Sequence, residues 1–431
     1  MIRRRSLLEI YLLLRLAQWW PHRWVNAARV AVQSRTASKA APGSDGRPRQ
    51  LLVDVSIIAR NDAGSGIQRV VRALLLCVLQ SPPDGFIVRP VQATRKQGYR
   101  YADNYLVKLS GQPRSDSSDS EVVQVAAGDV FLGLDLTSRI LPRRQSELLR
   151  WRQQGVKLVV VVYDLLPVLH PDWFTPIARK AFPRWLATLA VHADALFCIS
   201  ASVAKQADDW LRRQYSMQPA ALPTRWFHLG ADLVASQLPS NQGESPRYAQ
   251  FEEGSGPVIL MVGTIEPRKG HAQVLDALDI LWEQGGNVKL VIVGKPGWHM
   301  EAMAARLRQH PEAGKRLIWL ERAGDAELSH LYCRSNGLVM ASEAEGFGLP
   351  LVEAAQHGIP LLVRDIEVFR EIAGAHASYF AAGTGAELAP VLARWLDQLQ
   401  AGSAPDSRSM PWLTWSESAM QLKKLLATLP W

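Results

Sequence analysis

The strongest constraint in this sequence is a pattern of short apolar runs that alternate with amphipathic stretches of helical length. The pattern runs through about residues 50–235, stops in a polar segment, and starts again at residue 257. Short strands that are apolar on both faces and separated by helices are typical of parallel βαβ units. The chain is therefore predicted to be an α/β protein with two Rossmann-like, doubly wound domains, which we expect to face a cleft. In such sheets, ligands bind at the carboxyl ends of the strands.

The two rounds of the pattern set the predicted domains. The predicted strands are 51–58, 156–164, 195–200 and 225–229 in the first round, and 257–263, 289–294, 316–320, 337–341 and 360–364 in the second. The predicted helices of the first round are 67–80, 175–191 and 201–214. Segments rich in glycine, proline and serine predict linkers at 36–49 and 236–256. The domains therefore run over 50–235 and 257–405, and residues 406–431 hold a final amphipathic helix.

Residues 1–49 are predicted to be a basic amphipathic segment followed by a linker. The net charge of the chain is +9, and residues 1–35 supply +6 of it, with seven arginines against one acid, Glu9. The rest is close to neutral, which disfavours a nucleic-acid-binding face. The leucines at the start, with Trp19 and Trp20, favour an interfacial helix on an anionic membrane surface, because the apolar run is too short to span a bilayer. The alternative is a basic tail that packs on its own domain or is disordered.

The cysteines indicate the compartment. The chain has three, Cys77, Cys198 and Cys333, and they form no Cys-x-x-Cys motif. Neither a disulfide framework nor a zinc site is expected from this usage, which fits a reducing compartment. We therefore expect a cytoplasmic protein, with the N-terminal segment as its means of peripheral contact with the inner face of a membrane.

The clearest candidate site lies in the loop between the predicted strand that ends near Ala341 and a helix that starts near Leu349. Gly346 and Gly348 allow the backbone to approach a ligand closely, and the start of the helix attracts phosphate. Glu345 lies in the loop, and Glu353 is predicted on the first helical turn. Carboxylates beside a phosphate site suit sugar hydroxyls or a transition state with oxocarbenium character. The spacing alone is weak, because solvated charges on a loop and a helix would give it too.

A second cluster follows the first predicted strand of the second domain. A turn at Gly263 and Thr264 leads to the adjacent cations Arg268 and Lys269 at a helix start. Two cations there would hold a diphosphate through charge-assisted hydrogen bonds. The alternative is an exposed basic helix cap.

Three stretches of the second domain together resemble one family. VGTIEPRKG (262–270), VIVGKPGW (291–298) and SEAEGFGLPLVEAAQHGIP (342–360) look like the motifs of glycosyltransferase family 4, retaining enzymes of the GT-B fold. The likeness is to bacterial mannosyl- and rhamnosyltransferases of surface polysaccharide assembly, such as lipopolysaccharide. It covers about residues 50–430 and includes two first-domain stretches, 54–72 and 161–174.

The resemblance implies roles for individual residues. Glu345 would hold the donor sugar and help to stabilise its anomeric centre. Lys269 and Arg268 would bind the diphosphate and stabilise the leaving group, and Glu353 would bind the ribose. Other donor contacts would come from Gly66 in the first domain and from Thr264, Gly346, Phe347, Gly348 and Leu349 in the second. Residues 322–328 would lie near the nucleobase. The resemblance implies no metal and no cofactor, because the nucleotide-sugar is a substrate, and it implies that the C-terminal helix crosses back to the first domain.

The sequence departs from the family at two positions. Thr264 stands where many members have an arginine, so Arg268 would take part of that role. Tyr163 stands where many members have a histidine before an aspartate, here Asp164. His170 lies nearby, and Asp164 and His170 are the candidates on the acceptor side.

The function predicted from these features is sugar transfer from a nucleoside-diphosphate donor to a glycan or lipid-linked acceptor in polysaccharide biosynthesis. A catalytically silent module of the same fold, acting as a scaffold in an assembly complex, is the alternative. An epimerase or a glycan phosphorylase also remains, although no pyridoxal-lysine context is recognisable for the latter. A dinucleotide-dependent oxidoreductase is disfavoured, because no GxGxxG follows the first strand of either domain.

Overall fold

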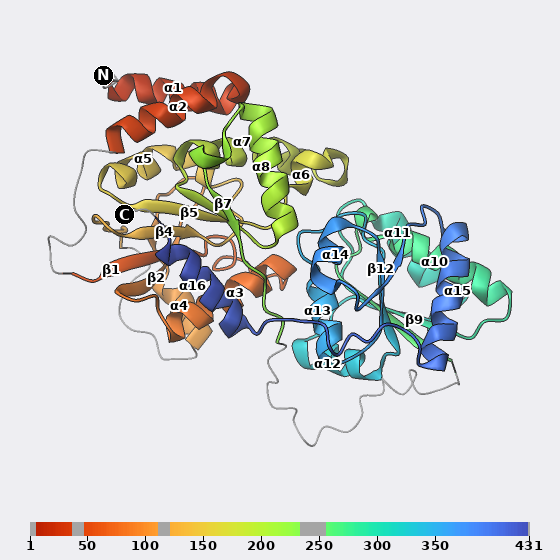
Figure 1. Ribbon diagram of the computed structural model, residues 1–431. Coiled ribbons are helices and arrows are strands. Elements are labelled where there is room, and N and C mark those ends of the chain that lie inside the picture. The colour runs from red at the N-terminus through yellow and green to blue at the C-terminus, as the bar shows by residue number, and fades with distance from the viewer. Residues whose placement is uncertain (1–5, 37–46, 111–120, 233–255, 430–431) are drawn as a thin grey trace. The chain divides into compact units, whose positions relative to one another are not determined.

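The computed structural model describes residues 6–36, 47–110, 121–232 and 256–429 (Figure 1). The chain divides into two compact units. The first unit comprises Met1–Leu229 together with Trp415–Trp431, and the second comprises Gly230–Thr414. Most of the two predicted linkers lies outside the described residues. Both units are built on parallel sheets covered by helices, which confirms the predicted α/β class with two Rossmann-like domains.

The sheet of the first unit has seven strands in the order β3-β2-β1-β4-β5-β6-β7. The strands are β1 (Arg49–Asp54), β2 (Phe86–Gln92), β3 (Arg100–Tyr101), β4 (Val130–Gly133), β5 (Lys157–Val162), β6 (Ala195–Cys198) and β7 (Thr224–Trp226). Among the described strands of this sheet, only β3 pairs antiparallel, with β2. The sequence prediction missed β2, β3 and β4. Pro90 interrupts the apolar run of β2, and β4 has only four residues, all buried.

The helices of the first unit cover both faces of its sheet (Figure 1). They are α3 (Gly66–Gln80), α4 (Asp103–Ser110), α5 (Gln145–Gln153), α6 (Leu166–Leu169), α7 (Pro176–His192) and α8 (Ala201–Tyr215), with short 3₁₀ turns η1 (Leu141–Arg143), η2 (Pro171–Trp173) and η3 (Pro219–Ala221). Ser65 and Gln68 form a capping box at the start of α3, which fixes where the loop after β1 ends.

The N-terminal segment forms a helical hairpin, α1 (Leu7–Trp19) and α2 (Pro21–Thr36), that packs on α5, α7 and α8. Its inner face includes Ile10, Val25 and Val32, all with no exposed surface. Buried Arg29 donates from Nη1 to the carbonyl oxygens of Ala190 and Ala193. The hairpin is therefore part of the first unit, as the packed alternative required. No helix among the described residues is long and apolar enough to span a bilayer.

The sheet of the second unit has six parallel strands in the order β10-β9-β8-β11-β12-β13. They are β8 (Val258–Val262), β9 (Lys289–Val293), β10 (Leu317–Leu320), β11 (Gly337–Met340), β12 (Leu361–Arg364) and β13 (Ser378–Phe380). The helices are α10 (His271–Glu283), α11 (Glu301–Gln309), α12 (Asp325–Arg334), α13 (Leu349–Gln356), α14 (Glu367–Ala373) and α15 (Gly385–Ala401), with the 3₁₀ turn η4 (Pro267–Lys269). All five predicted strands are present, and β13 was missed.

The chain returns to the first unit at its end. Helix α16 (Trp415–Ala427) belongs to that unit and packs on α3. Ser418 donates its hydroxyl to the carbonyl of His228 at 2.7 Å, and Gln421 accepts the His228 N–H at 3.1 Å. The predicted crossing of the C-terminal helix is therefore confirmed.

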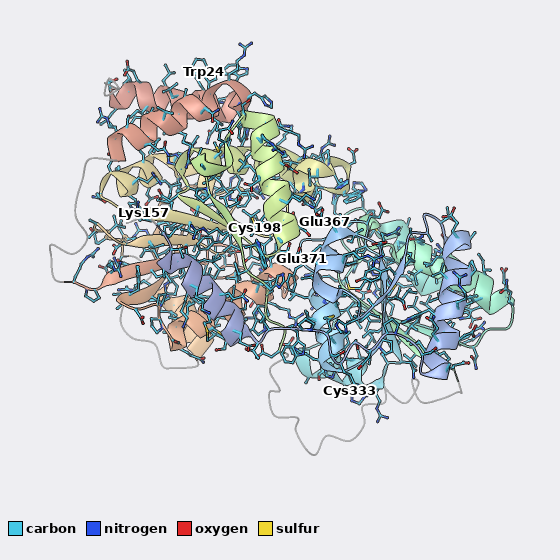
Figure 2. All side chains as sticks on the ribbon, in the orientation of Figure 1. Trp24, Lys157, Cys198, Cys333, Glu367 and Glu371 are labelled. Carbon is cyan, nitrogen blue, oxygen red and sulfur yellow. The ribbon has the colours of Figure 1, made fainter. Side chains whose placement is uncertain are left out.

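The three cysteines occupy three different environments, and Figure 2 labels two of them, Cys198 and Cys333. Cys198 is buried at the end of β6, Cys77 is half-buried on α3, and Cys333 is exposed on α12. All three are free thiols.

Candidate functional site

The candidate site of the second unit lies where β8 and β11 end side by side in the sheet. These strands are hydrogen-bonded neighbours, so the loops after them meet at one sheet edge. The β8 loop carries Arg268 and Lys269 on the turn η4, and the β11 loop carries Glu345. The backbone joins the two loops as well, because the Glu343 N–H donates to the Arg268 carbonyl at 2.7 Å.

Glu345 is held between the two predicted cations. Lys269 Nζ donates to Glu345 Oε1, and Arg268 Nη1 lies 3.2 Å from Glu345 Oε2. Arg268 also donates to the carbonyl of Ala344 at 3.0 Å and pairs with Glu266 at 2.8 Å. Only 10% of the Glu345 side chain is exposed. The sequence prediction placed Glu345, Lys269 and Arg268 in one site, and the structure brings them together.

The ionisation of Glu345 results from two opposing effects. Burial favours the neutral acid, but the nearby charges of Lys269 and Arg268 outweigh it and lower the pKa of Glu345 to about 2. Glu345 is therefore a carboxylate at neutral pH. A desolvated carboxylate between two cations can accept hydrogen bonds from hydroxyl groups and can stabilise positive charge nearby.

Helix α13 begins directly after this loop and presents an uncapped N-terminus. Its N-cap residue is Gly348, no side chain caps its first turn, and Pro350 removes one backbone donor. Gly348 has φ 100°, and a Cβ there would lie 3.0 Å from the ring of Phe369. This turn therefore requires glycine. Leu349 is the first residue of the helix, and the positive end of the helix dipole is directed at the loop of Glu345.

Glycines also bring the β8 loop close to its neighbours. Gly270 has φ 71°, and a Cβ there would lie 2.5 Å from the carbonyl oxygen of Ala341. A Cβ added at Gly263 would lie 3.7 Å from Nζ of Lys269. The half-buried Thr264 follows Gly263 in this same turn. Gly270 thus allows the β8 loop to pack directly against the start of the β11 loop.

Glu353 lies deeper than the sequence predicted. It is the fifth residue of α13, at the start of the second turn rather than on the first, and it has no exposed surface. Its carboxylate accepts a hydrogen bond from the hydroxyl of Tyr332 at 2.8 Å. Phe347 is also buried, with 4% exposed, so its side chain packs while its backbone belongs to the loop with Gly346.

Gly66, Asp164 and His170 belong to the first unit. Gly66 is the exposed first residue of α3, and a Cβ there would meet open space. Asp164 accepts the N–H of Leu166 at 3.0 Å. His170 is exposed and stacks on Trp173 with ring centroids 4.0 Å apart.

Tyr163 follows the last residue of β5 and is buried. Its hydroxyl donates to the carbonyl of Leu134 at 2.7 Å, and burial raises its pKa well above the usual value. The side chain that stands in the position of the family histidine is therefore a packing residue.

Sequence reasoning missed two groups that support the site. Arg364, at the end of β12, donates from Nε to the carbonyl of Ala341 at 3.0 Å and so holds the start of the β11 loop. His271, the first residue of α10, is buried, and burial together with Lys269 lowers its pKa to about 3. Both follow a strand or a loop that the pattern located, but only the fold shows which way they point.

The first unit also holds buried carboxylates at the ends of its strands. Burial raises the pKa of Asp54 to about 7, and its carboxylate accepts hydrogen bonds from Tyr99 and Ser56. Asp135 accepts the backbone N–H groups of Ile57 and Ile58 at 2.7 and 2.8 Å. These groups fix the start of the loop that leads to α3. In the described part of the chain, no group of three or more His, Cys, Asp or Glu side chains could share a metal ion.

Comparison with known proteins gives a family match within the second half of the chain. Residues 247–400 match the family model of glycosyl transferases group 1. They are a group 1 glycosyltransferase domain. The match contains η4, the β11 loop and α13, so the site described above belongs to this domain.

Curated relatives extend the likeness over most of the chain. A serotype-specific mannosyltransferase WbdA of Escherichia coli is 41% identical over 380 residues, which is 88% of this chain and 46% of that protein. The chain thus spans about half the length of these curated relatives. The O-antigen chain mannosyltransferase RfbU of Salmonella typhimurium is 24% identical over 49% of this chain and 53% of its own length.

Solved structures share the fold of the group 1 domain and of the unit before it. Anabaena HepE in complex with UDP and glucose has a TM-score of 0.59 and 15% identity, covering 89% of this chain and 100% of that one. WaaG, a glycosyltransferase involved in lipopolysaccharide biosynthesis, has a TM-score of 0.51 and 15% identity, covering 87% of this chain and 95% of that one.

Proposed function

We propose that this chain is a glycosyltransferase that moves a sugar from a nucleoside-diphosphate donor to a glycan or lipid-linked acceptor in surface polysaccharide assembly. The observation that carries the proposal is the ionised Glu345, held by Lys269 and Arg268 beside the uncapped start of α13. Cations and a helix N-terminus suit a diphosphate, and a carboxylate beside them suits a sugar.

The donor would bind through the second unit. Its diphosphate would lie at the N-terminus of α13. The positive charges of Lys269 and Arg268 would stabilise the diphosphate as it leaves. Glu345 would then accept hydrogen bonds from the sugar hydroxyls and stabilise positive charge at the anomeric carbon. Glu353 would bind the ribose, and this requires its carboxylate to become accessible from its place beside Tyr332.

The stereochemical outcome would be retention. The acceptor hydroxyl would attack from the face that the diphosphate leaves, and the departing phosphate oxygen would take the acceptor proton. This step needs no protein base on the acceptor side, which fits a chain whose Tyr163 is buried in packing. Asp164 and His170 would then orient the acceptor.

Mannose is the favoured donor sugar. Three relatives with 41–42% identity over 88% of this chain are named as mannosyltransferases. The same comparisons offer nothing in favour of the silent scaffold. Sugar choice depends on a few contacts around the ring and the base, so rhamnose and related sugars are the competitors to test.

Ligand-induced stabilisation tests the donor site first. GDP, UDP, dTDP and their sugars are added to purified protein, and the unfolding temperature is recorded. We expect one base to stabilise the fold by about 2.7 kcal/mol at a concentration near 100 times its Kd. Glu345→Gln should retain this binding of the nucleotide but lose most of the turnover. A folded protein that responds to no nucleotide would refute the proposal.

We also propose that the enzyme works at an anionic membrane surface, where a lipid-linked acceptor is found. The support is the outer face of α1, which leaves Leu8 80% and Leu12 58% exposed although the hairpin itself is packed.

A further inference from the structure

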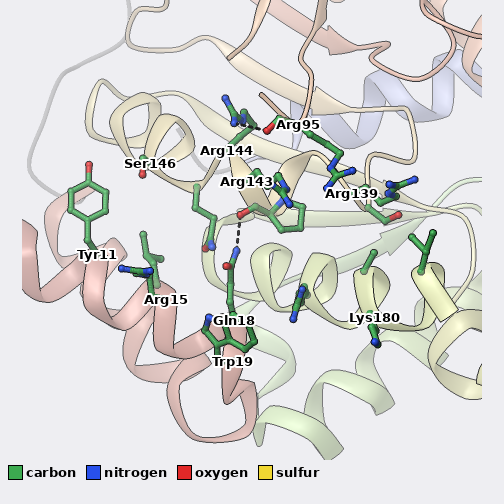
Figure 3. Close-up of a pocket in the computed structure, with 17 residues that line it drawn as sticks. Tyr11, Arg15, Gln18, Trp19, Arg95, Arg139, Arg143, Arg144, Ser146 and Lys180 are labelled. Carbon is green, nitrogen blue, oxygen red and sulfur yellow. Dashed lines mark hydrogen bonds between the residues drawn. The ribbon is translucent and has the colours of Figure 1, made fainter. Parts of the chain in front are cut away.

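A large pocket lies in the first unit, between the N-terminal hairpin and the body of the domain (Figure 3). Its volume is about 820 Å³, and α1, η1, the start of α5 and α7 line it. Gln18 on α1 donates to the carbonyl of Pro142 at 2.6 Å, and this bond joins the two sides of the pocket (Figure 3). The pocket exists only because the hairpin is packed on the domain, so no motif in the sequence predicts it.

The lining of the pocket is strongly basic. Seven of its residues are cations, namely Arg15, Arg95, Arg139, Arg143, Arg144, Lys180 and Arg184, and none is an acid. Among the residues that the structure describes, none of the seven forms an ion pair. Glu147 is near enough to Arg144 for the two charges to interact, but the two side chains are not within ion-pair distance. The Glu147 carboxylate accepts the backbone N–H of Tyr99 at 3.0 Å.

Arg144 lies in the wall of the pocket, where its Nη2 donates to the carbonyl oxygen of Arg95 at 3.3 Å (Figure 3). Nε of Arg144 is buried and forms no hydrogen bond within the described part of the chain. Seven cations without an acid repel one another in one pocket, so an anion bound among them would relieve this charge repulsion. A cluster of several arginines favours phosphate in particular, because each guanidinium group can donate two parallel hydrogen bonds to phosphate oxygens.

The rim of the pocket is apolar and exposed. Trp19 is 65% exposed and Ile177 is 57% exposed, and both line the pocket. The guanidinium of Arg184 lies 4.9 Å from the ring centroid of Trp19. Leu8 and Leu12 lie on the same face of α1 as Trp19, because the spacings of four and seven residues bring side chains to one side of a helix. An apolar rim around a basic pocket suits a ligand with a charged head and an apolar tail.

We propose that this pocket binds the phosphate headgroup of a membrane lipid, while Trp19, Ile177 and the outer face of α1 rest on the acyl chains. The proposal deepens the membrane contact given above and rests on it. It assigns the contact to a defined phosphate site and not to diffuse charge. A lipid with a phosphomonoester or diphosphate head carries more charge on each headgroup than a diester lipid, so the seven cations favour it.

Vesicle flotation tests this site with the full-length protein. Three vesicle types are compared: phosphatidylcholine alone, the same lipid with phosphatidylglycerol, and the same lipid with phosphatidic acid at equal total charge. We expect binding in the order phosphatidic acid, phosphatidylglycerol, phosphatidylcholine, and we expect inorganic pyrophosphate to compete. Lys180→Gln should weaken binding to phosphatidic acid vesicles about fivefold, and Arg143→Gln with Lys180→Gln on the order of 25-fold, which corresponds to about 1 kcal/mol per basic residue.

Lys108→Gln is the matched control, because Lys108 is an exposed helical lysine of the same unit that does not line the pocket. Equal effects of Lys180→Gln and Lys108→Gln would overturn the site and leave only diffuse attraction. Absence of binding to any of the three vesicle types would overturn the lipid assignment. None of these readouts involves nucleotide binding or sugar transfer, so a failure here is distinct from a failure of the donor site.

Discussion

At the residue scale, the charge state of Glu345 depends on its two cationic neighbours. Lys269 and Arg268 hold the carboxylate ionised in a place where burial alone would favour the neutral acid. The three side chains are therefore one electrostatic unit, and a change in one member alters the other two. In the proposed donor complex, the diphosphate would compete with Glu345 for the same cations, which would couple donor binding to the position of the carboxylate.

Glu345→Gln should change how stability depends on pH. Because the folded-state pKa of Glu345 is about 2 and the usual value is 4.5, its ion pairs stabilise the fold above about pH 4.5, and this stabilisation is lost as the pH falls toward 2. Over this pH range, the unfolding free energy of the wild type should fall by up to about 3 kcal/mol more than that of the variant. Urea unfolding of both proteins across these pH values measures the difference. Glu283→Gln, at an exposed position at the end of α10, should behave like the wild type.

Lys269→Ala should weaken binding of the nucleoside diphosphate by roughly 1.5–3 kcal/mol, the scale of a hydrogen bond to a charged group. It should also raise the pKa of Glu345, since one of the two charges that lower it is gone. Calorimetric titration with the nucleotide found in the stabilisation screen gives the affinity. Lys315→Ala, an exposed lysine of the same unit, serves as the control. Equal affinities of the two variants would mean that the diphosphate binds elsewhere.

At the scale of elements, the sequence pattern located the site but not its depth. Alternating strands and helices gave the loops after β8 and β11, and both loops carry the predicted charges. The pattern could not show that β8 and β11 are neighbours in the sheet, nor that Glu353 lies under Tyr332. Neighbouring strands and burial come from long-range packing, which local spacing does not encode.

Gly348→Ala tests the turn that begins α13. The positive φ of 100° disfavours any residue with a Cβ, and the new methyl group would lie 3.0 Å from the ring of Phe369. We expect a loss of about 1–3 kcal/mol in unfolding free energy, together with weaker nucleotide binding, because the helix start would shift. Gly383→Ala, at an exposed position before α15 with no positive φ, is the matched control, because a Cβ there would make only an ordinary contact of 3.5 Å with the Glu387 carboxylate. Similar stability of both variants would show that the turn tolerates a side chain.

At the scale of the whole molecule, sequence order and structural units do not coincide. The first unit takes its last helix from the end of the chain, after the entire second unit has been passed. It also takes its first two helices from a segment whose composition indicates a membrane surface. The apolar residues of α1 are divided between two faces, because Ile10 is buried in the first unit and Leu8 is exposed on the same helix. Composition could not separate these two faces, whereas burial does.

The last prediction concerns how far the stability of the first unit depends on α16. Leu422 is fully buried on α16, so Leu422→Ala should cost about 2–5 kcal/mol through lost burial and a residual cavity. The loss should fall on the first unit, although residue 422 follows the second unit in sequence. Hydrogen exchange should therefore quicken in α3, which α16 covers, and stay unchanged in β8 and β11. Met420→Ala, 48% exposed on the same helix, should change neither. Equal loss of protection in α3 and in β8 and β11 would mean that the two units unfold together.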